Sequence, residues 1–306
     1  IALKKGYHGT HFGGASVNGN QNFRRNYEPL LPGVFHLPAP WTYRNPFGTS
    51  DGAEIAAAIG RLFEDEIAFQ GADTIAALIV EPVLGAGGVI VPHETFLPLM
   101  RAICDRHGIL LIADEVITGF GRAGSESGSR LWGIRPDMIS TAKGISNGYF
   151  PLGAAMISEK IAGVIEGAKG AAGTISHGYT YSGHPVGCAA ALEALAETKR
   201  LALNENAAAR GAELEKALEI AKARHALVGD VRGKGLMAAL ELVSNREAKI
   251  PADKKTMAKA ADAAYEAGVM LRVSGNTIIL SPPLIVTSAD IDKIAEGLDA
   301  GLEAAR

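Results

Sequence analysis

The feature that most constrains the fold is an alternation between short apolar segments and helical patterns. Residues 74–82 (TIAALIVEP) and 109–115 (ILLIADE) predict two strands, the second of them fully buried. Between them, residues 95–108 have helical spacing and a glycine stop. Strands that alternate with helices in this way predict a mainly parallel sheet covered by helices on both faces. We therefore expect an α/β fold.

The same alternation continues toward the middle of the chain. Residues 138–143 (MISTAK) and 153–158 (GAAMIS) predict two further strands, and residues 185–200 predict a helix. Residues 17–50 are polar, contain several prolines and predict irregular structure. These elements together predict a large domain over residues 1–205.

The last third of the chain has a different character. Residues 204–224 are rich in alanine and glutamate and have a helical period. Short apolar segments follow, with helices expected at 254–267 and 288–304. This pattern predicts a smaller α+β domain over residues 206–306, with a hinge in or near the helix at 204–224.

Composition excludes several classes of protein. The net charge is −3, so no basic surface indicates a nucleic acid or an anionic membrane as partner. No apolar run is long enough to span a bilayer. The only two cysteines, Cys104 and Cys188, are far apart, which argues against a disulfide scaffold or a zinc knuckle. We expect a cytoplasmic protein without a metal site, because a reducing compartment suits this cysteine content.

Two charged residues end predicted strands and are the candidates for chemistry. Asp114 follows four apolar residues, and ligands bind at the carboxyl edge of open α/β sheets. Lys143 ends the strand MISTAK and stands directly before a glycine. A lysine at a desolvated strand end can act as an amine nucleophile toward carbonyls. Pyridoxal phosphate needs such a pair, a lysine to hold its aldehyde and an acid to keep its ring nitrogen protonated. Taken singly, a salt-bridged aspartate and a solvated lysine are the ordinary interpretations.

The stretch after Asp114 also contains a formal G-x-G-x-x-G pattern, formed by Gly119, Gly121 and Gly124. A dinucleotide-binding loop would continue into an amphipathic helix whose N-terminus meets the pyrophosphate. The following residues, SESGSRLWGIRP, are polar and broken. We therefore interpret these glycines as a turn, and a dinucleotide-dependent oxidoreductase is the weakest alternative.

Several motifs together resemble the class III pyridoxal-phosphate-dependent aminotransferases. The most specific is LLIADEVITGFGR, followed after an interval by W-GIRPDMISTAKGISNGYFPLGA. Further matches run in the same order along nearly the whole chain: YHG (7–9), IVEPVLGAGG (79–88), GYTYSGHPVGCAAALEAL (178–195), VRGKGLMAALEL (231–242) and ILSPPL (279–284). The resemblance implies the fold-type-I architecture, with a mostly parallel sheet in a large domain, a small C-terminal domain, and a homodimer with composite active sites.

The resemblance also implies roles for residues that match its motifs. Lys143 would hold the cofactor as a Schiff base and carry the proton between substrate and cofactor. Asp114 would pair with the pyridinium nitrogen. Val116 would lie against one face of the ring and Tyr7 would stack on the other. His8, in the same YHG motif as Tyr7, is assigned to the cofactor pocket.

Two further residues enter by resemblance alone. Thr180, in YTYSGHP, would reach the cofactor phosphate of the opposite subunit, although a threonine before an apolar helix is usually an N-cap. Glu81 would lie at the cofactor and on the substrate side, where it can meet a mobile arginine, although a strand-end acid with a local partner is the ordinary interpretation.

The substrate is indicated by three positions. Relatives that use 2-oxoglutarate often carry glutamine at the position of Ile117 and arginine at that of Ile279. The arginine here is instead Arg272, which resembles the flexible substrate-binding arginine of the omega (amine–pyruvate) transaminases. A snorkelling strand-end arginine is the ordinary interpretation of Arg272. We expect transfer of an amino group from an amine or omega-amino acid to an oxo acid, with pyruvate as acceptor.

One departure from the family pattern leaves alternatives open. The family binds the cofactor phosphate with a small-residue loop upstream of YHG, and only six residues precede Tyr7. We therefore expect the chain to lack an N-terminal segment of a longer protein. A 2-oxoglutarate-dependent aminotransferase, an aminomutase or decarboxylase, and an inactive dimerisation fragment remain as alternatives.

Overall fold

The computed structural model describes residues 1–306, with the side chains of all residues except 171 and 172. The chain forms two compact units. The first comprises residues 1–82, 92–120 and 126–201, and the second comprises 83–91, 121–125 and 202–306. The units therefore divide at 201/202, and the second also takes up two short segments from the N-terminal part of the chain. The domain boundary predicted at 205/206 stays a prediction.

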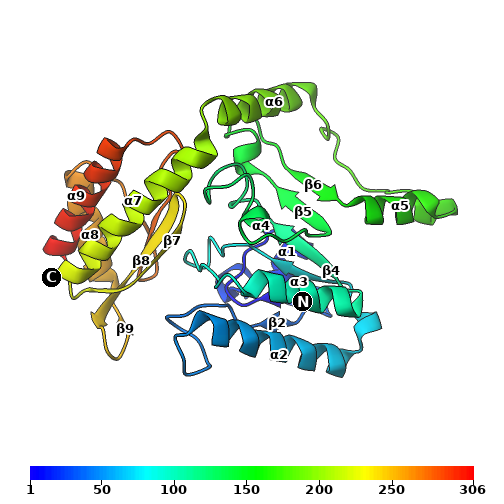
Figure 1. Cartoon of the computed structure of the whole chain (residues 1–306), viewed down its shortest axis with the longest axis horizontal. Coiled ribbons are helices and arrows are strands. Elements are labelled where there is room, and N and C mark those ends of the chain that lie inside the picture. The colour runs from blue at the N-terminus through cyan, green and yellow to red at the C-terminus, as the bar shows by residue number, and fades with distance from the viewer. The chain divides into compact units, whose positions relative to one another are not determined.

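The first unit contains a sheet with the order β3-β4-β5-β6, in which β3, β4 and β5 are parallel (Figure 1). Ile1 donates a hydrogen bond to the Ala77 carbonyl and accepts one from the Ile79 amide, which adds β1 and its neighbour β2 in parallel beside β3. The predicted mostly parallel sheet is thus confirmed. The strands are β1 (Ala2–Leu3), β2 (His36–Leu37), β3 (Ala77–Val80), β4 (Leu110–Asp114), β5 (Met138–Thr141) and β6 (Ala154–Ile157).

The strand β6 departs from the expected pattern. It pairs antiparallel with β5, and all four of its residues are exposed. On the neighbouring strands, Leu78, Val80, Leu111 and Ala113 are buried, whereas the alternate residues of β3 and the first part of β4 are only half-buried. The prediction of a sheet covered on both faces is therefore wrong for the described chain: one face is buried at β3 and β4, whereas β6 is exposed on both faces.

The helices of the first unit begin and end at recognisable signals. In α2, the Asp51 carboxylate caps the first turn by accepting from the Ala53 and Glu54 amides. The helix α3 ends at Gly108, which has a left-handed conformation (φ 69°). The helices are α1 (Phe12–Val17), α2 (Gly52–Gln70), α3 (Phe96–His107), α4 (Gly128–Leu131), α5 (Glu159–Gly167) and α6 (Pro185–Arg200).

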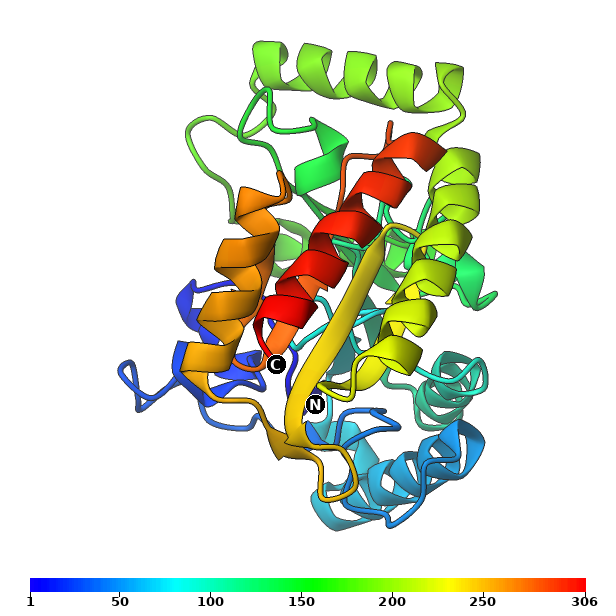
Figure 2. The same cartoon turned by 90° about the vertical axis from the view of Figure 1, so that its left-hand side faces the viewer.

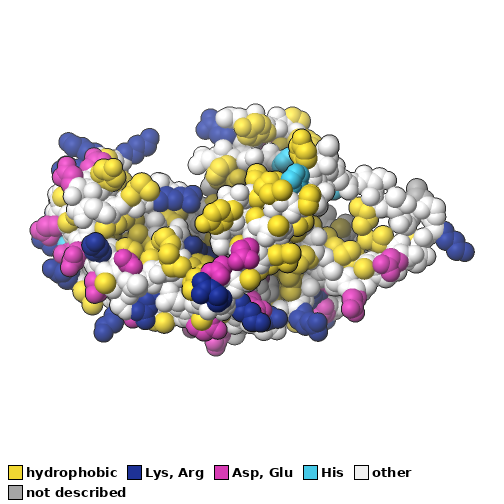
Figure 3. Space-filling view, turned by 90° about the horizontal axis from the view of Figure 1, so that it is seen from above, with side chains coloured by type: hydrophobic (Ala, Val, Ile, Leu, Met, Phe, Trp, Pro, Cys, Tyr) yellow, Lys and Arg dark blue, Asp and Glu magenta, His cyan; other side chains and the backbone are white. Residues whose placement is uncertain are grey.

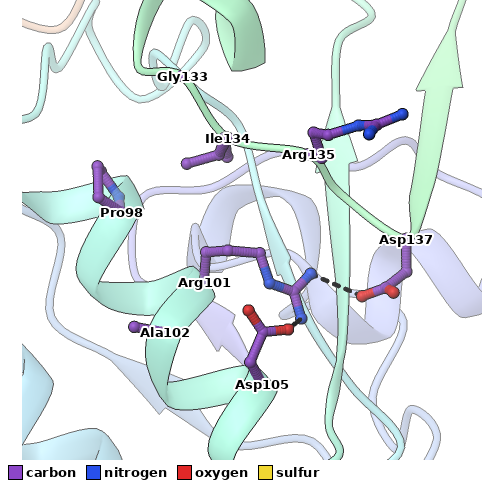
Figure 4. Close-up of a pocket in the computed structure, with 8 residues that line it drawn as sticks. All are labelled: Pro98, Arg101, Ala102, Asp105, Gly133, Ile134, Arg135 and Asp137. Atoms are coloured by element: carbon purple, nitrogen blue, oxygen red, sulfur yellow. Dashed lines mark hydrogen bonds and ion pairs between the residues drawn. The ribbon is translucent and has the colours of Figure 1, made fainter.

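An ion-pair clamp joins α3 to the amino end of β5. The Arg101 guanidinium donates to Asp137 at 2.7 Å and pairs with Asp105 at 2.7 Å, beside an open cavity of about 350 Å³ (Figure 4). Asp137 also accepts from the Leu111 amide. Burial alone would raise the pKa of the Asp137 carboxyl, but the hydrogen bonds from Leu111 and Arg101 outweigh it and hold the pKa below its usual range. The cavity contains none of the predicted site residues.

We expect Arg101→Met to destabilise the protein at neutral pH by about 3 kcal/mol, because it leaves the mostly buried Asp137 without its cation. A carboxylate with a lowered folded-state pKa stabilises above its unfolded pKa, about 3.9, and loses that contribution as the pH falls further. The gap between wild type and variant in urea-unfolding midpoint should therefore close below about pH 4. The exposed Arg106→Met is the control and should cost under about 1 kcal/mol. A gap that persists unchanged to pH 3 would contradict this role.

The second unit is built on an antiparallel sheet with the order β10-β11-β8-β7, to which β9 adds by pairing with β8. Its helices α7, α9 and α8 lie side by side on one face of this sheet (Figure 2). The arrangement agrees with the α+β pattern expected for the end of the chain. The elements are α7 (Leu203–Arg224), β7 (Val228–Lys234), β8 (Met237–Asn245), β9 (Ile250–Pro251), α8 (Lys254–Glu266), β10 (Arg272–Ser274), β11 (Thr277–Leu280) and α9 (Ser288–Ala304).

The core of the second unit is apolar and continuous. Leu214 and Leu218 of α7, Leu240 of β8 and Leu298 of α9 are among its fully buried side chains. A capping box at Thr287 and Asp290 fixes the start of α9. Among the helices that the structure describes, none has both the length and the apolar character needed to cross a bilayer.

Candidate active site

Charged side chains gather at the carboxyl edge of the parallel sheet. Glu81 follows β3 directly, Asp114 ends β4, and Lys143 stands two residues after the end of β5. Asp114 is in register with Ser140 on the neighbouring parallel strand. Parallel strands end at the same edge of a sheet, and neighbours lie roughly 4.8 Å apart. The fold therefore places the predicted lysine and aspartate at one edge, on adjacent strands.

Asp114 is buried and held by two partners. One carboxylate oxygen lies 2.8 Å from Nδ1 of His8, and the other accepts the Val116 amide at 3.1 Å. Both side chains are buried, 3% exposed for His8 and 8% for Asp114. Because an ionised carboxylate only accepts, the His8 proton facing it must be on Nδ1. His8 therefore orients Asp114, and its Nε2 is buried without a hydrogen-bond partner among the described residues.

Tyr7 and Glu81 are brought together at the same edge. The Tyr7 amide donates to a carboxylate oxygen of Glu81 at 2.9 Å, and Glu81 is 5% exposed. The Tyr7 ring lies 4.8 Å from the ring of Phe23 at a tilt of 59°. The hydrogen bond to Glu81 thus fixes the backbone position of Tyr7. The stacking of Tyr7 on a cofactor stays a prediction.

One residue beside Tyr7 and His8 was not singled out by the sequence. Asn18 is fully buried and accepts the His8 amide at 2.5 Å, while its own amide group donates to the Gly9 carbonyl at 2.9 Å. Asn18 thereby closes the turn that carries Tyr7 and His8. The only available signal was an asparagine directly before a glycine in VNGN, which is also typical of an ordinary turn.

Lys143 occupies a strained backbone position. Its φ is 46°, in the left-handed region that non-glycine residues rarely adopt. Such outliers cost on the order of 1–3 kcal/mol and cluster at functional sites. The following glycine packs tightly, since a Cβ at Gly144 would lie 2.9 Å from the Cβ of Phe120. Lys143 is exposed, so the desolvation expected for it is not present in the isolated chain.

The remaining predicted residues lie elsewhere. Thr180 is exposed in a turn before α6, and Arg272 is exposed at the start of β10 in the second unit. Arg272 stands opposite Ile279 in the register of β10 and β11, and Ile279 is the position that carries arginine in the resemblance to 2-oxoglutarate users. Among the described residues, no hydrogen bond or ion pair joins either residue to Asp114. Their roles in binding stay predictions.

The turn interpretation of G-F-G-R-A-G is confirmed. Residues 116–127 form successive turns, in which Gly121 and Gly124 have φ of 98° and 83°. The Arg122 guanidinium donates to the Leu236 and Pro282 carbonyls. Residues 121–125 belong to the second unit, and these turns are not the start of a phosphate-binding helix.

A parallel sheet with a lysine and a buried aspartate at its carboxyl edge, joined to a small α+β unit, defines a fold-type-I pyridoxal-phosphate-dependent transferase. The family model for aminotransferase class III matches residues 1–302. The chain therefore belongs to the class III aminotransferases. In the described part of the chain, no group of three or more His, Cys, Asp or Glu side chains could hold a metal ion.

Solved structures extend this likeness to the whole described fold. An amine transaminase from an uncultivated Pseudomonas species, in its PLP-bound form, is 50% identical with a TM-score of 0.98 and covers 100% of this chain and 69% of its own. An (S)-enantioselective omega-transaminase from Thermomicrobium roseum is 39% identical with a TM-score of 0.94, over 99% of this chain and 67% of its own.

Curated relatives carry different substrate names. A probable gamma-aminobutyrate transaminase 4 from Oryza sativa is 38% identical over 99% of this chain and 63% of its own length. A diaminobutyrate–2-oxoglutarate transaminase from Halomonas elongata is 38% identical over 96% and 64%. The chain thus spans less than two thirds of the length of these relatives.

The residues at the sheet edge fit pyridoxal phosphate. Its pyridine nitrogen needs a buried acid, and Asp114 is one, oriented by His8. Its aldehyde needs a primary amine, and Lys143 supplies one at the adjacent strand end. Nε2 of His8 is buried and has no hydrogen-bond partner among the described residues, so it has the capacity for one further hydrogen bond.

Proposed function

We propose that the chain carries the catalytic centre of an aminotransferase that moves an amino group from a primary amine or omega-amino acid to an oxo acid, with pyruvate as acceptor. The observation that carries the proposal is the meeting of Asp114 and Lys143 at the carboxyl edge of neighbouring parallel strands. The 50% identity to an amine transaminase supports the same chemistry.

When bound, pyridoxal phosphate supplies an electron sink for the bonds at the amine carbon. Asp114 holds the proton on the ring nitrogen, and His8 keeps the carboxylate in place through Nδ1. Lys143 would hold the aldehyde through Nζ, and its free amine would carry the proton taken from the substrate carbon. Tyr7 and Val116 would lie against the two faces of the ring. Thr180 would reach the phosphate of the cofactor in the opposite subunit.

The proposed acceptor rests on the positions beside the substrate. Ile117 and Ile279 are apolar where 2-oxoglutarate users often carry polar groups, and Ile279 is buried. Arg272 is the guanidinium proposed to pair with the carboxylate of pyruvate, since a planar fork matches a carboxylate well. Glu81 lies on the substrate side. The names of the relatives span both kinds of acceptor, so 2-oxoglutarate is the competing outcome.

We also propose that the active protein is a homodimer with composite sites. Large apolar side chains before and along α6 are exposed: Tyr149, Tyr179, Tyr181, Val186 and Leu192, between 59% and 86%. Apolar side chains gather beside histidine side chains on the face shown in Figure 3. Patches of this kind mark interfaces. Thr180 lies within this stretch, in keeping with a role in the site of a second copy.

The test is a screen of amine donors against oxo acids with the full chain and added pyridoxal phosphate. We expect an amine and pyruvate to give alanine and a carbonyl product. Arg272→Met should raise KM for pyruvate by roughly 10- to 100-fold, because a charge-assisted bidentate contact is lost. It should leave the half-reaction with an uncharged amine within about threefold.

The matched control for that variant is Arg246→Met, which removes an exposed guanidinium of the same unit that donates to backbone carbonyls. It should leave both constants unchanged. The proposal requires that at least one amine donor reacts. Exclusive use of 2-oxoglutarate, or decarboxylation without amino transfer, would replace the proposal with one of its competitors.

A further inference from the structure

We infer that Glu115 is a positioning residue, whose buried carboxylate fixes the wall of the site formed by Val116 and Ile117. The inference rests on the proposed function, because it concerns the surroundings of the same cofactor ring. Glu115 follows Asp114 directly and is 1% exposed. Its partners are Thr118, in the turns that follow β4, and Gly128 and Ser129, at the start of α4.

The carboxylate is saturated by four donors. One oxygen accepts the Ser129 amide at 2.7 Å and the Ser129 hydroxyl at 2.5 Å. The other accepts the Gly128 amide at 2.8 Å and the Thr118 hydroxyl. Burying a carboxylate is costly unless its lone pairs are all used, so an arrangement this complete holds its partners firmly.

These donors come from the two ends of one loop. Thr118 is three residues after Glu115, whereas Gly128 and Ser129 begin α4, thirteen and fourteen residues after it. The carboxylate therefore closes the run of turns over 116–127 as a staple. The residues between, including Phe120 with φ 57°, are held without regular secondary structure.

The staple is also packed against the end of the neighbouring strand. A Cβ at Gly128 would lie 2.5 Å from the Cβ of Pro82, which follows Glu81, and 3.0 Å from that of Thr118. Only glycine permits this approach at the donor that faces Glu115. The cluster therefore lies where β3 and β4 end, beside the predicted site residues Glu81 and Asp114.

Val116 and Ile117 lie between two fixed points. The Val116 amide is bound to Asp114, and Thr118 is bound to Glu115. With hydrogen bonds at both ends, the backbone of Val116 and Ile117 has little freedom to turn these two side chains away from the ring. A misplacement of about 1 Å can cost roughly 10²-fold in rate, so loosening one pin should be visible in catalysis.

The variant Glu115→Gln tests this assignment. The glutamine amide group must face either the Gly128 or the Ser129 amide, and two N–H donors then oppose each other. Hydroxyl groups can rotate to adapt, but backbone amides cannot. In the cofactor-loaded protein, we expect KM for the amine to rise roughly tenfold or more. We also expect the visible circular dichroism band of the bound cofactor to shift.

The control is Glu126→Gln, which makes the same change at an exposed position of the same loop, where the carboxylate pairs with Arg130. It should leave KM and the visible band unchanged. If Glu115→Gln does not fold, Ser129→Ala and Thr118→Val remove one hydroxyl donor each and keep both amides. Each should raise KM by about two- to fivefold.

The outcomes separate the two proposals. A loss of thermal stability in Glu115→Gln with normal KM and an unchanged visible band would mean that Glu115 only stabilises the fold, and would overturn the inference. The same result from both hydroxyl variants would also overturn it. A wild-type chain that binds the cofactor but shows no amino transfer would instead overturn the proposed function, and the visible band would still report on Glu115.

Discussion

The Lys143→Ala variant is expected to lose the visible absorption of the bound cofactor at its wild-type wavelength and to fall in amino-transfer rate by roughly 10⁴-fold or more. The reason is that the proposed function gives Nζ of Lys143 two tasks, binding the aldehyde and moving the proton at the substrate carbon. The methyl group of alanine provides neither. Alanine keeps the Cβ that makes the left-handed conformation at φ 46° unfavourable, so the backbone strain stays and stability should remain close to that of the wild type.

The measurement is an absorption spectrum and a turnover assay on the same preparation, with far-ultraviolet circular dichroism to establish folding. Lys160→Ala is the matched control, since Lys160 is an exposed lysine on α5 of the same unit. It should match the wild type in both readouts. Normal turnover in Lys143→Ala would remove the chemical basis of the proposed function.

Asp114→Asn is expected to lower the rate by on the order of 10³-fold while cofactor binding weakens less. Asparagine has nearly the same shape, but only its one oxygen accepts. That oxygen can accept the Val116 amide while the side-chain NH2 donates to Nδ1 of His8, which then takes the other tautomer. Asparagine lacks the negative charge that keeps the ring nitrogen protonated. The loss should therefore fall on kcat, because the charge is needed where electrons enter the ring.

The control for this variant is Asp65→Asn, the same change at an exposed position on α2. Steady-state kinetics and a cofactor titration give both quantities. If Asp114→Asn kept its kcat within about threefold of wild type, the buried carboxylate would be a structural acid paired with His8, and the assignment at the ring nitrogen would fail.

The elements that the sequence predicted well are those whose pattern is local. The apolar run ILLIA with Asp114 after it contains β4. The segment with helical spacing that stops at Gly108 forms α3. The helix predicted at 185–200 has those bounds in the structure. In each case burial and the stop signal lie within a few residues, so no distant part of the chain was needed.

The features that the sequence did not predict depend on distant contacts. The antiparallel direction of β6 follows from how it pairs with β5, and nothing in AAMI specifies it. The strand β10 is only Arg272–Ser274, the residues that pair with β11. The transfer of residues 121–125 to the second unit follows from Arg122, whose carbonyl partners are over a hundred residues away.

The candidate site was predicted in its strand-end positions and missed in its supports. Asp114 and Lys143 could be found because a charge after an apolar run is conspicuous. The partners of Asp114 and His8, and the four donors around Glu115, could not be found in this way. They are brought together by turns, and a turn residue such as Asn18 or Ser129 has the same local pattern whether or not it supports a site.

The central claim is that Lys143 is the amine that holds the cofactor beside Asp114. The direct measurement is reduction of the cofactor-loaded full chain with borohydride, followed by digestion and peptide mass spectrometry. We expect the pyridoxyl mass on the peptide that contains Lys143, at near-stoichiometric yield. Labelling of a different lysine, or an unlabelled chain after saturation with cofactor, would contradict it.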